Sequence, residues 1–476
     1  MKNTVRILIT WLVLVCMLIP MLAGCNLMEM LGMKDAEDTT VATDTSDTSA
    51  IETEPSTTPA ATTTKPNNDT PYPSTALQKN AYIFGKTQKD ALNYKVGEEI
   101  LFDIRLTDSS NTNATYPCSR FVWHAEADDG QTWTGSKKGD NGRMTLGFTL
   151  TKPGAIRVTV EAYDHEGKVM TNVTSFVGGA FAGFDQIKTA VTCPADFDEF
   201  WQNQLNVLDQ YQPEAIEKTL LSSSSSTYDK YSVKIRTHQA DAPVTGYLVV
   251  PKNAEPGSLK IRLSFSGYNA SMGKPAEPAG STKYITLSVN AHAMENGQPD
   301  SYYENLKESL GQFGFSASDY ADPSTSYFRN MILRDVQALR YAKSLPEWNG
   351  TDIELSGGSM GGFQATAVAA LEPGVTKLSV HIVWMCDVGG RSIGRLEGWL
   401  PEYTENLNYF DSVNFAARVT CPTTISRAGL IDYTTTPIGV AAYYNALQGT
   451  KSITFKQSAE HVLDPKINAG VYTRYN

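Results

Sequence analysis

The stretch Ile353-Glu-Leu-Ser-Gly-Gly-Ser-Met-Gly-Gly362 joins a short apolar run to Ser359, which lies in the pattern Gly-x-Ser-x-Gly. A helix-forming run from Phe363 to Leu371 follows directly. The glycines indicate a turn that is too tight and too crowded for Cβ atoms beside the serine. The sequence therefore predicts a strand, a sharp turn and a helix, with the serine hydroxyl held out at the turn.

A serine on such a turn is typical of the nucleophile elbow of α/β-hydrolases, where the hydroxyl lies at the carboxyl edge of the sheet. The backbone N–H of Met360 would then point at the place where an oxyanion forms during acyl transfer. The pattern favours an acyl-transferring enzyme. The alternative is a Gly-rich turn that contains a serine by chance, since three fixed positions recur easily.

The catalytic base can be sought by elimination, because the acid and then the histidine follow the serine in this fold. Four of the six histidines precede Ser359, and His381 lies in the apolar run 378–384, which predicts a core strand. His461 remains, in a predicted loop after the strand-like run 452–456. We therefore expect His461 to be the base.

The acid should lie at the end of the strand before that histidine. Asp432 follows the predicted strand 422–427 and falls between the last two strands. Asp387 also ends a predicted strand and is the rival, while Asp411 and Asp464 are expected at a turn and at a helix start or the surface. We favour Asp432, whose alternative role is to cap a helix that begins near Pro437.

Length and charge restrict the class of protein. The 476 residues exceed one typical domain, and 40 Lys and Arg against 51 Asp and Glu give a net charge of −11. No basic cluster occurs, which argues against nucleic acid and anionic membrane surfaces as partners. No metal-ligand spacing is present either, so we expect no metal and no other cofactor.

The N-terminus predicts export. Lys2 and Arg6 precede an apolar run from Ile7 to Leu22, so residues 1–24 have the form of a signal peptide. The ending Leu-Ala-Gly-Cys25 resembles the bacterial lipobox, in which the cysteine is lipidated and anchors the protein at the membrane or cell surface. A plain signal peptide or an uncleaved anchor is the alternative.

Two folded parts follow a predicted tether. Residues 25–75 are the predicted lipidated N-terminus and disordered linker, and the part from Met33 to Thr75, rich in Thr, Ser, Asp, Glu and Pro, has a predicted reach of roughly 35 Å. Residues 76–180 contain short runs of period two, which predict a smaller all-β sandwich of immunoglobulin type. Residues 186–476 alternate strands and helices, which predicts an α/β fold with a doubly wound, mainly parallel sheet.

The second folded part resembles the acetylxylan esterase and cephalosporin C deacetylase family, carbohydrate esterase family seven, over roughly residues 190–465. The matching motifs are Pro194-Ala-Asp-Phe-Asp-Glu-Phe-Trp201, Phe265-Ser-Gly-Tyr-Asn269, Tyr327-Phe-Arg329, Gly357-Gly-Ser-Met-Gly-Gly362, Cys421-Pro422, Gly429-Leu-Ile-Asp432 and His461. This resemblance implies Ser359 as nucleophile, His461 as base and Asp432 as acid. It further implies an oxyanion hole from the N–H groups of Tyr268 and Met360, and the removal of acetyl groups from xylan or its oligosaccharides.

The chain departs from the family where Arg-Gly-Gln is usual, since it has Asn290-Ala-His-Ala-Met-Glu-Asn-Gly-Gln298 there. His292 in this segment is expected either to contact substrate or to serve as a hydrogen-bonded loop histidine. Tyr302 and Tyr303 follow and are expected either to bind sugar rings or to fill an insertion. The departure argues against the acetyl specificity and the closed homo-oligomer that the resemblance implies. A homo-oligomer is still one of the assemblies considered.

Two other functions compete with this expectation. One is an esterase for a bulkier acyl group, or a peptidase of the same fold. The other is a surface lipoprotein that binds carbohydrate and has an inactive hydrolase domain. An intact serine, acid and histidine in the required order argues against the second.

Lipidation of Cys25 leads to a first test. Mass spectrometry of the mature N-terminus should detect an acylated Cys25, and Cys25→Ala should release or misprocess the protein. An unmodified N-terminus at another residue would contradict the lipoprotein prediction.

Overall fold

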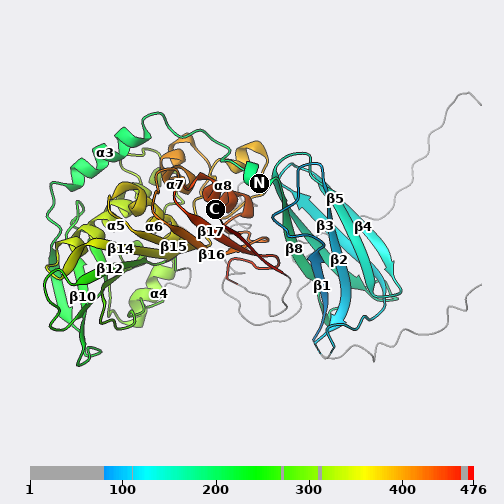
Figure 1. Cartoon of the computed structure of the whole chain (residues 1–476), viewed down its shortest axis with the longest axis horizontal. Coiled ribbons are helices and arrows are strands. Elements are labelled where there is room, and N and C mark those ends of the chain that lie inside the picture. The colour runs from blue at the N-terminus through cyan, green and yellow to red at the C-terminus, as the bar shows by residue number, and fades with distance from the viewer. Residues whose placement is uncertain (1–79, 110, 270–272, 309–312, 463–469, 476) are drawn as a thin grey trace, which may run out of the picture.

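The computed structural model describes residues 80–109, 111–269, 273–308, 313–462 and 470–475 (Figure 1). The predicted signal peptide, Cys25 and the whole of the predicted tether lie outside these residues. In Figure 1 the strands of residues 80–182, drawn in blue and cyan, lie beside the red C-terminal elements. The chain thus brings its first folded segment onto its last one.

Residues 81–182 form two four-stranded sheets. Their orders are β5-β2-β1-β7 and β4-β3-β6-β8. The strands are β1 (Ala81–Thr87), β2 (Glu99–Asp108), β3 (Cys118–Ala127), β4 (Thr132–Gly139), β5 (Arg143–Thr149), β6 (Gly154–Tyr163), β7 (Val173–Thr174) and β8 (Phe176–Ala182).

The alternation of apolar residues explains why these sheets pack together. In β5 the even positions are buried and the odd ones exposed, as a strand with one face in a core requires. Aromatic rings then meet across the two sheets: Phe102 lies 6.2 Å from Phe176, and Trp133 lies 5.3 Å from Phe148. The all-β character predicted for this segment is present, while its immunoglobulin type stays a prediction.

The remainder of the chain contains a ten-stranded sheet in the order β18-β17-β16-β15-β14-β12-β13-β11-β10-β9. Pairing is parallel from β13 through β12 to β17 and antiparallel at both ends. The strands are β9 (Ala215–Leu220), β10 (Tyr228–Ile235), β11 (Val244–Pro251), β12 (Leu259–Phe265), β13 (Tyr284–Val289), β14 (Trp348–Gly358), β15 (Lys377–His381), β16 (Thr423–Gly429), β17 (Lys451–Lys456) and β18 (Val471–Tyr475).

Helices pack against this sheet, as the alternation of strands and helices predicts. They are α3 (Phe197–Leu208), α4 (Asp300–Glu308), α5 (Tyr327–Ser344), α6 (Met360–Leu371), α7 (Ser412–Ala416) and α8 (Pro437–Ala446), with short 3-10 turns at 184–186, 291–293, 317–319, 390–393 and 405–410. Helix α6 is buried along most of its length, and this explains its nearly continuous run of small and apolar residues.

The strand order reverses direction at β12, which lies between β13 and β14. The carboxyl ends of β12 and β14 are therefore neighbours, with Phe265 opposite Gly357. In open α/β sheets such a switch point leaves a crevice outside the strand ends. The glycine-bracketed serine directly follows β14 and so lies at this point.

In the ten-stranded sheet, three strands were not predicted, and one is shorter than predicted. Strand β15 ends at His381 rather than Trp384, because Ile382 has φ of 41° and turns the chain. Strands β9, β10 and β18 lie toward the two edges of the sheet. Their residues are mostly exposed or half-buried, so they lack the apolar pattern that marks the central strands.

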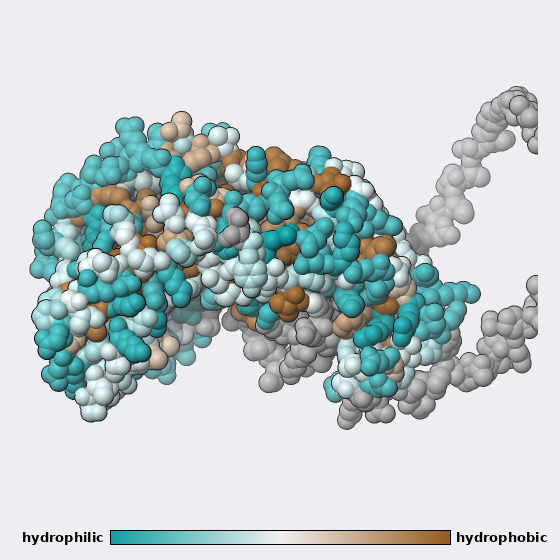
Figure 2. All heavy atoms as spheres, in the orientation of Figure 1, coloured by the Kyte–Doolittle hydropathy of each residue, from teal (hydrophilic) through white to brown (hydrophobic). Residues whose placement is uncertain are grey.

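The surface in Figure 2 is mainly hydrophilic, with apolar residues in small separate groups. Within the described ranges, no helix has the length and apolarity needed to cross a membrane.

Candidate active site

Ser359 lies at a strained turn between β14 and α6, with φ of 55° and ψ of −123°. Its N–H donates to the carbonyl of His381 at 3.1 Å, and its own carbonyl accepts from Trp384 N at 3.1 Å. A Cβ at Gly357 would collide with the backbone of Gly361, and a Cβ at Gly361 would collide with the carbonyl of Phe265. The two glycines of the motif are thus required by backbone packing, as the sequence predicts.

Three side chains from separate strand ends form one hydrogen-bonded chain. His461 Nε2 lies 3.0 Å from Ser359 Oγ, and His461 Nδ1 lies 3.0 Å from Asp432 Oδ2. Ser359 follows β14, Asp432 follows β16 and His461 follows β17, so neighbouring parallel strands deliver all three to one edge. The structure therefore brings together the three residues that the sequence singled out.

Asp432 is fully buried and is surrounded by hydrogen-bond donors. Its Oδ1 accepts from the N–H groups of Thr434 at 2.7 Å and Thr435 at 2.9 Å, and its Oδ2 accepts from Thr435 Oγ1 at 2.8 Å. These donors stabilise a buried carboxylate and fix its direction. The alternative role of Asp432 as a helix cap is filled by Thr436, which accepts from Gly439 N at 3.3 Å.

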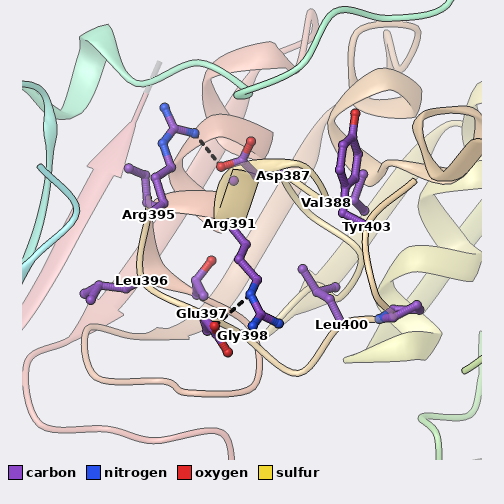
Figure 3. A pocket seen from close by; sticks show the side chains of 13 residues that line it. Asp387, Val388, Arg391, Arg395, Leu396, Glu397, Gly398, Leu400 and Tyr403 are labelled. Atoms are coloured by element: carbon purple, nitrogen blue, oxygen red, sulfur yellow. Dashed lines mark hydrogen bonds and ion pairs between the residues drawn. The ribbon is translucent and has the colours of Figure 1, made fainter. Parts of the chain in front are cut away.

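The rival acid, Asp387, is occupied elsewhere. Its carboxylate pairs with Arg395 and accepts from Ala190 N at 2.5 Å and Thr189 Oγ1 at 3.1 Å (Figure 3). Asp387 thus links the loop 387–403 to the segment that precedes α3.

Asp411, expected at a turn, is the N-cap of α7. It accepts from the N–H groups of Asp387 at 3.1 Å, Val388 at 3.0 Å and Val413 at 2.8 Å. Burial raises the pKa of Asp411 to about 7, and nearby Asp387 adds to this shift. Asp464 lies outside the described residues.

The two groups implied for the oxyanion hole flank the serine. Met360 is the first residue of α6, so its N–H has no acceptor within the helix and lies at its positive end. A Cβ at Gly267 would be 3.4 Å from Gly358 O and 3.9 Å from Ser359 Cβ. Gly267, which follows the end of β12, therefore lies beside Ser359, and Tyr268 is the next residue in the chain.

His292 uses both ring nitrogens within the protein. Nδ1 lies 2.5 Å from the hydroxyl of Tyr327, and Nε2 lies 2.8 Å from the carbonyl of Tyr268. Burial lowers the pKa of His292 to about 4, so the neutral ring donates from Nε2 to that carbonyl and accepts at Nδ1. This arrangement matches the hydrogen-bonded loop histidine considered above, and it fixes the backbone of Tyr268.

Tyr302 and Tyr303 lie on α4, where their hydroxyls contact the loop 295–298. The Tyr302 hydroxyl accepts from Glu295 N at 3.2 Å. The Tyr303 hydroxyl donates to Glu295 O at 2.7 Å and accepts from Gln298 N at 3.3 Å, and Tyr303 is buried. These contacts correspond to the second role considered above, in which the two tyrosines fill an insertion.

Four aromatic rings pack against one another, and we call them the aromatic cluster: Tyr268, Phe315, Trp384 and Trp399. Ring centroids lie 4.8 Å apart for Tyr268 and Trp399, 4.6 Å for Phe315 and Trp399, and 5.5 Å for Trp384 and Trp399. Sequence analysis missed this cluster because its members come from three distant loops.

Clustered metal-binding side chains are absent from the described residues, and the thiols there are unpaired. In the described ranges, no group of three or more His, Cys, Asp and Glu side chains could hold a metal ion. Cys118, Cys193, Cys386 and Cys421 are free thiols there, and burial is the main cause that raises the pKa of each. The expected independence from metals stays a prediction.

Comparisons with known proteins concern the second folded part. The sequence matches the acetyl xylan esterase (AXE1) family over residues 182–393 and 401–473. It is 28% identical over 316 residues to the acetyl esterase Axe7A of Xylanibacter ruminicola, which covers 60% of this chain and 66% of that protein. The chain thus spans slightly less than two thirds of this relative.

Two solved structures are similar. An acetyl xylan esterase from Paenibacillus sp. R4 has 23% identity and a TM-score of 0.49, covering 59% of this chain and 94% of that one. Acetyl xylan esterase 1 from Thermoanaerobacterium sp. JW/SL YS485 has 19% identity and a TM-score of 0.46, covering 60% and 93%. Strands β1 to β7 lie outside the family match.

The hydrogen-bonded chain gives a prediction on the acid. Ser359→Ala, His461→Ala and Asp432→Asn should each lower kcat by roughly 10⁴-fold, because members of such a chain act as a unit. Asp387→Asn is the control: it should lower the melting temperature and leave kcat per titrated active site near the wild-type value. A large loss of kcat in Asp387→Asn, with kcat of Asp432→Asn near the wild-type value, would assign the acid to Asp387.

Protonation of His292 gives a prediction on stability. Its folded pKa of about 4 lies below the ordinary value of 6.5, so the unfolded chain binds the proton more readily. Its contribution to stability is present above pH 6.5 and is lost as the pH falls toward 4. In urea unfolding, the free energy of unfolding should fall between pH 7 and pH 5, and this fall should be ~1–2 kcal/mol larger for the wild type than for His292→Asn. Equal falls would contradict a neutral, buried ring.

Proposed function

The chain belongs to the acetyl xylan esterase (AXE1) family, and from this membership we propose that it is a serine carbohydrate esterase that removes acetyl groups from acetylated xylan or xylo-oligosaccharides. The family is one of carboxylic ester hydrolases. The observation that carries the proposal is the hydrogen-bonded chain of Ser359, His461 and Asp432, at 3.0 Å for each of its two contacts with the histidine.

The geometry supports a two-step acyl transfer. His461 Nε2 takes the proton of Ser359 Oγ as the oxygen attacks the ester carbonyl, and Asp432 holds the ring in the required tautomer. The N–H groups of Met360 and Tyr268 stabilise the oxyanion, a contribution worth roughly 10²–10³-fold per donor in kcat. The histidine then returns the proton to the leaving sugar hydroxyl, and water releases acetate by the same route.

The aromatic cluster supports a small acyl group. Trp384 is buried, and its backbone N–H donates to the carbonyl of Ser359, so this residue lies next to the nucleophile in the structure. Phe315 and Trp399 are half-buried and pack against that ring. A site walled by large rigid rings accepts a methyl group and rejects longer chains by overpacking.

We place this activity outside the bacterial cell. The Leu-Ala-Gly-Cys25 ending and the apolar run before it support export and a lipid anchor at Cys25, and residues 25–75 would tether the enzyme to the surface. Residues 76–180 then form the smaller immunoglobulin-like sandwich, and residues 186–476 form the α/β-hydrolase domain. The substrate partner is an acetylated plant polysaccharide, with no nucleic acid partner.

A series of esters tests the acyl preference. Hydrolysis should fall from p-nitrophenyl acetate to the butyrate by about 10-fold or more, and further for the octanoate. Phe315→Ala should raise the butyrate-to-acetate ratio of kcat/KM, because it opens the aromatic cluster. Phe200→Ala, which removes a half-buried ring that packs against Tyr409, is the matched control.

Two outcomes would contradict the proposal. A preference for octanoate by the wild-type chain would overturn the deacetylase assignment and leave the serine chemistry intact. Loss of activity in EDTA would overturn the serine chemistry itself, because no step in it involves a metal.

A further inference from the structure

We propose that the N-terminal β strands are a positioning element of the active site, which holds the loops of the catalytic acid and base in place. Apart from Ala182 at the end of β8, these strands lie outside the family match, yet β6 and β8 contact the segments that carry Asp432 and His461. The inference rests on the serine chemistry proposed above. Figure 1 shows the two parts side by side, with β8 next to β16 and β17.

Arg157 of β6 holds the acid loop. Its side chain is only 4% exposed, and Nη2 donates to the backbone carbonyl of Asp432 at 3.3 Å. The guanidinium also lies 4.0 Å from the ring centroid of Tyr433, and Nη1 pairs with Glu126 at 3.6 Å. A buried cation is costly unless it is paired, so these partners hold one another in a single arrangement.

Gly179 of β8 holds the segment that leads to the base. Its N–H donates to Gln457 O at 3.2 Å, and its carbonyl accepts from Gln457 Nε2 at 3.2 Å. Gln457 is fully buried and lies four residues before His461. A Cβ at Gly179 would lie 2.6 Å from the carbonyl of Leu430, so only glycine lets this strand reach both catalytic segments.

A third contact reaches the loop 387–403, which borders the acid loop (Figure 3). Asp128, between β3 and β4, accepts from Leu396 N at 3.0 Å through Oδ1 and from Ala155 N at 2.8 Å through Oδ2. Farther along the same loop, Trp399 N donates to the carbonyl of Thr434 at 3.0 Å. The N-terminal strands therefore hold Asp432 directly through Arg157. They also hold its loop indirectly, because Asp128 binds the loop 387–403 and that loop binds Thr434.

These contacts act on orientation rather than on charge. Apart from His461, the donors to the carboxylate of Asp432 lie within its own loop, whereas Arg157 binds the backbone carbonyl of the same residue. Loss of Arg157 would thus leave the acid chemically intact but free to shift. A shift of about 1 Å in a catalytic group can lower the rate by roughly 10²-fold.

The test compares arginine variants in the full chain. Arg157→Met should lower kcat per titrated active site by roughly 10–100-fold with KM within about twofold, because only positioning is lost. Arg157→Lys should restore most of the rate. Arg120→Met is the matched control, since Arg120 is an exposed arginine of the neighbouring β3 that lies over the Tyr163 ring at 4.9 Å.

A second variant keeps the test decisive if Arg157→Met fails to fold. Gly179→Ala should lower kcat in the same way, while Gly147→Ala, whose Cβ would meet only the mobile end of the Glu99 side chain, should have no effect. The inference would be overturned if kcat per titrated site in Arg157→Met equalled that of the wild type. If Arg157→Met does not fold, the same result in Gly179→Ala would overturn it.

Labelling of Ser359 by an organophosphonate separates this inference from the proposed function. If the wild-type chain labels but hydrolyses no acetyl ester, the substrate assignment fails, and the labelling rates of the variants then test positioning. Slower labelling of Arg157→Met than of Arg120→Met supports the inference in that case, and equal rates overturn it.

Discussion

The left-handed backbone of Ser359 is the constraint on which the site depends. A serine at φ of 55° is disfavoured by its own Cβ, so neighbouring groups must hold it. Hydrogen bonds to His381 and Trp384 anchor the residue. Gly361 lets strand β12 approach, and Gly357 leaves room for the backbone of Gly361. This turn places the hydroxyl outside the sheet and brings Gly267 and Met360 to either side of it.

The strands then decide which residues can reach that hydroxyl. Strands β14, β16 and β17 run parallel, so whatever follows each of them arrives at the same edge. Asp432 is fully buried with four hydrogen-bond contacts to its carboxylate, and the histidine between it and the serine has little freedom. Asp387 and Asp411 are also buried, but their carboxylates bind backbone N–H groups, and Asp387 also pairs with Arg395. These contacts stabilise the loop 387–403.

Much of this could be predicted from the sequence, because the decisive signals are local. The apolar central strands and the glycines around Ser359 can be recognised from a few consecutive residues. Chain order then indicated His461 as the base and Asp432 as the acid. The sequence did not predict the roles of residues that depend on neighbours far away in the chain. His292 stood in a loop with two open roles, and only its contacts with Tyr327 and Tyr268 distinguish them. Edge strands such as β9 and β18 have too few buried residues to show a pattern.

The contact between Gly179 and Gln457 has an evolutionary consequence. A module joined only by a tether can be lost or exchanged by recombination without harm to its neighbour. Here the carbonyl and N–H of one glycine complete the hydrogen bonding of a glutamine buried in the other part. Replacement of the β strands by an unrelated module would leave those polar groups buried without partners. The two parts of this chain are therefore expected to be inherited together, with the glycine and the glutamine changing in step.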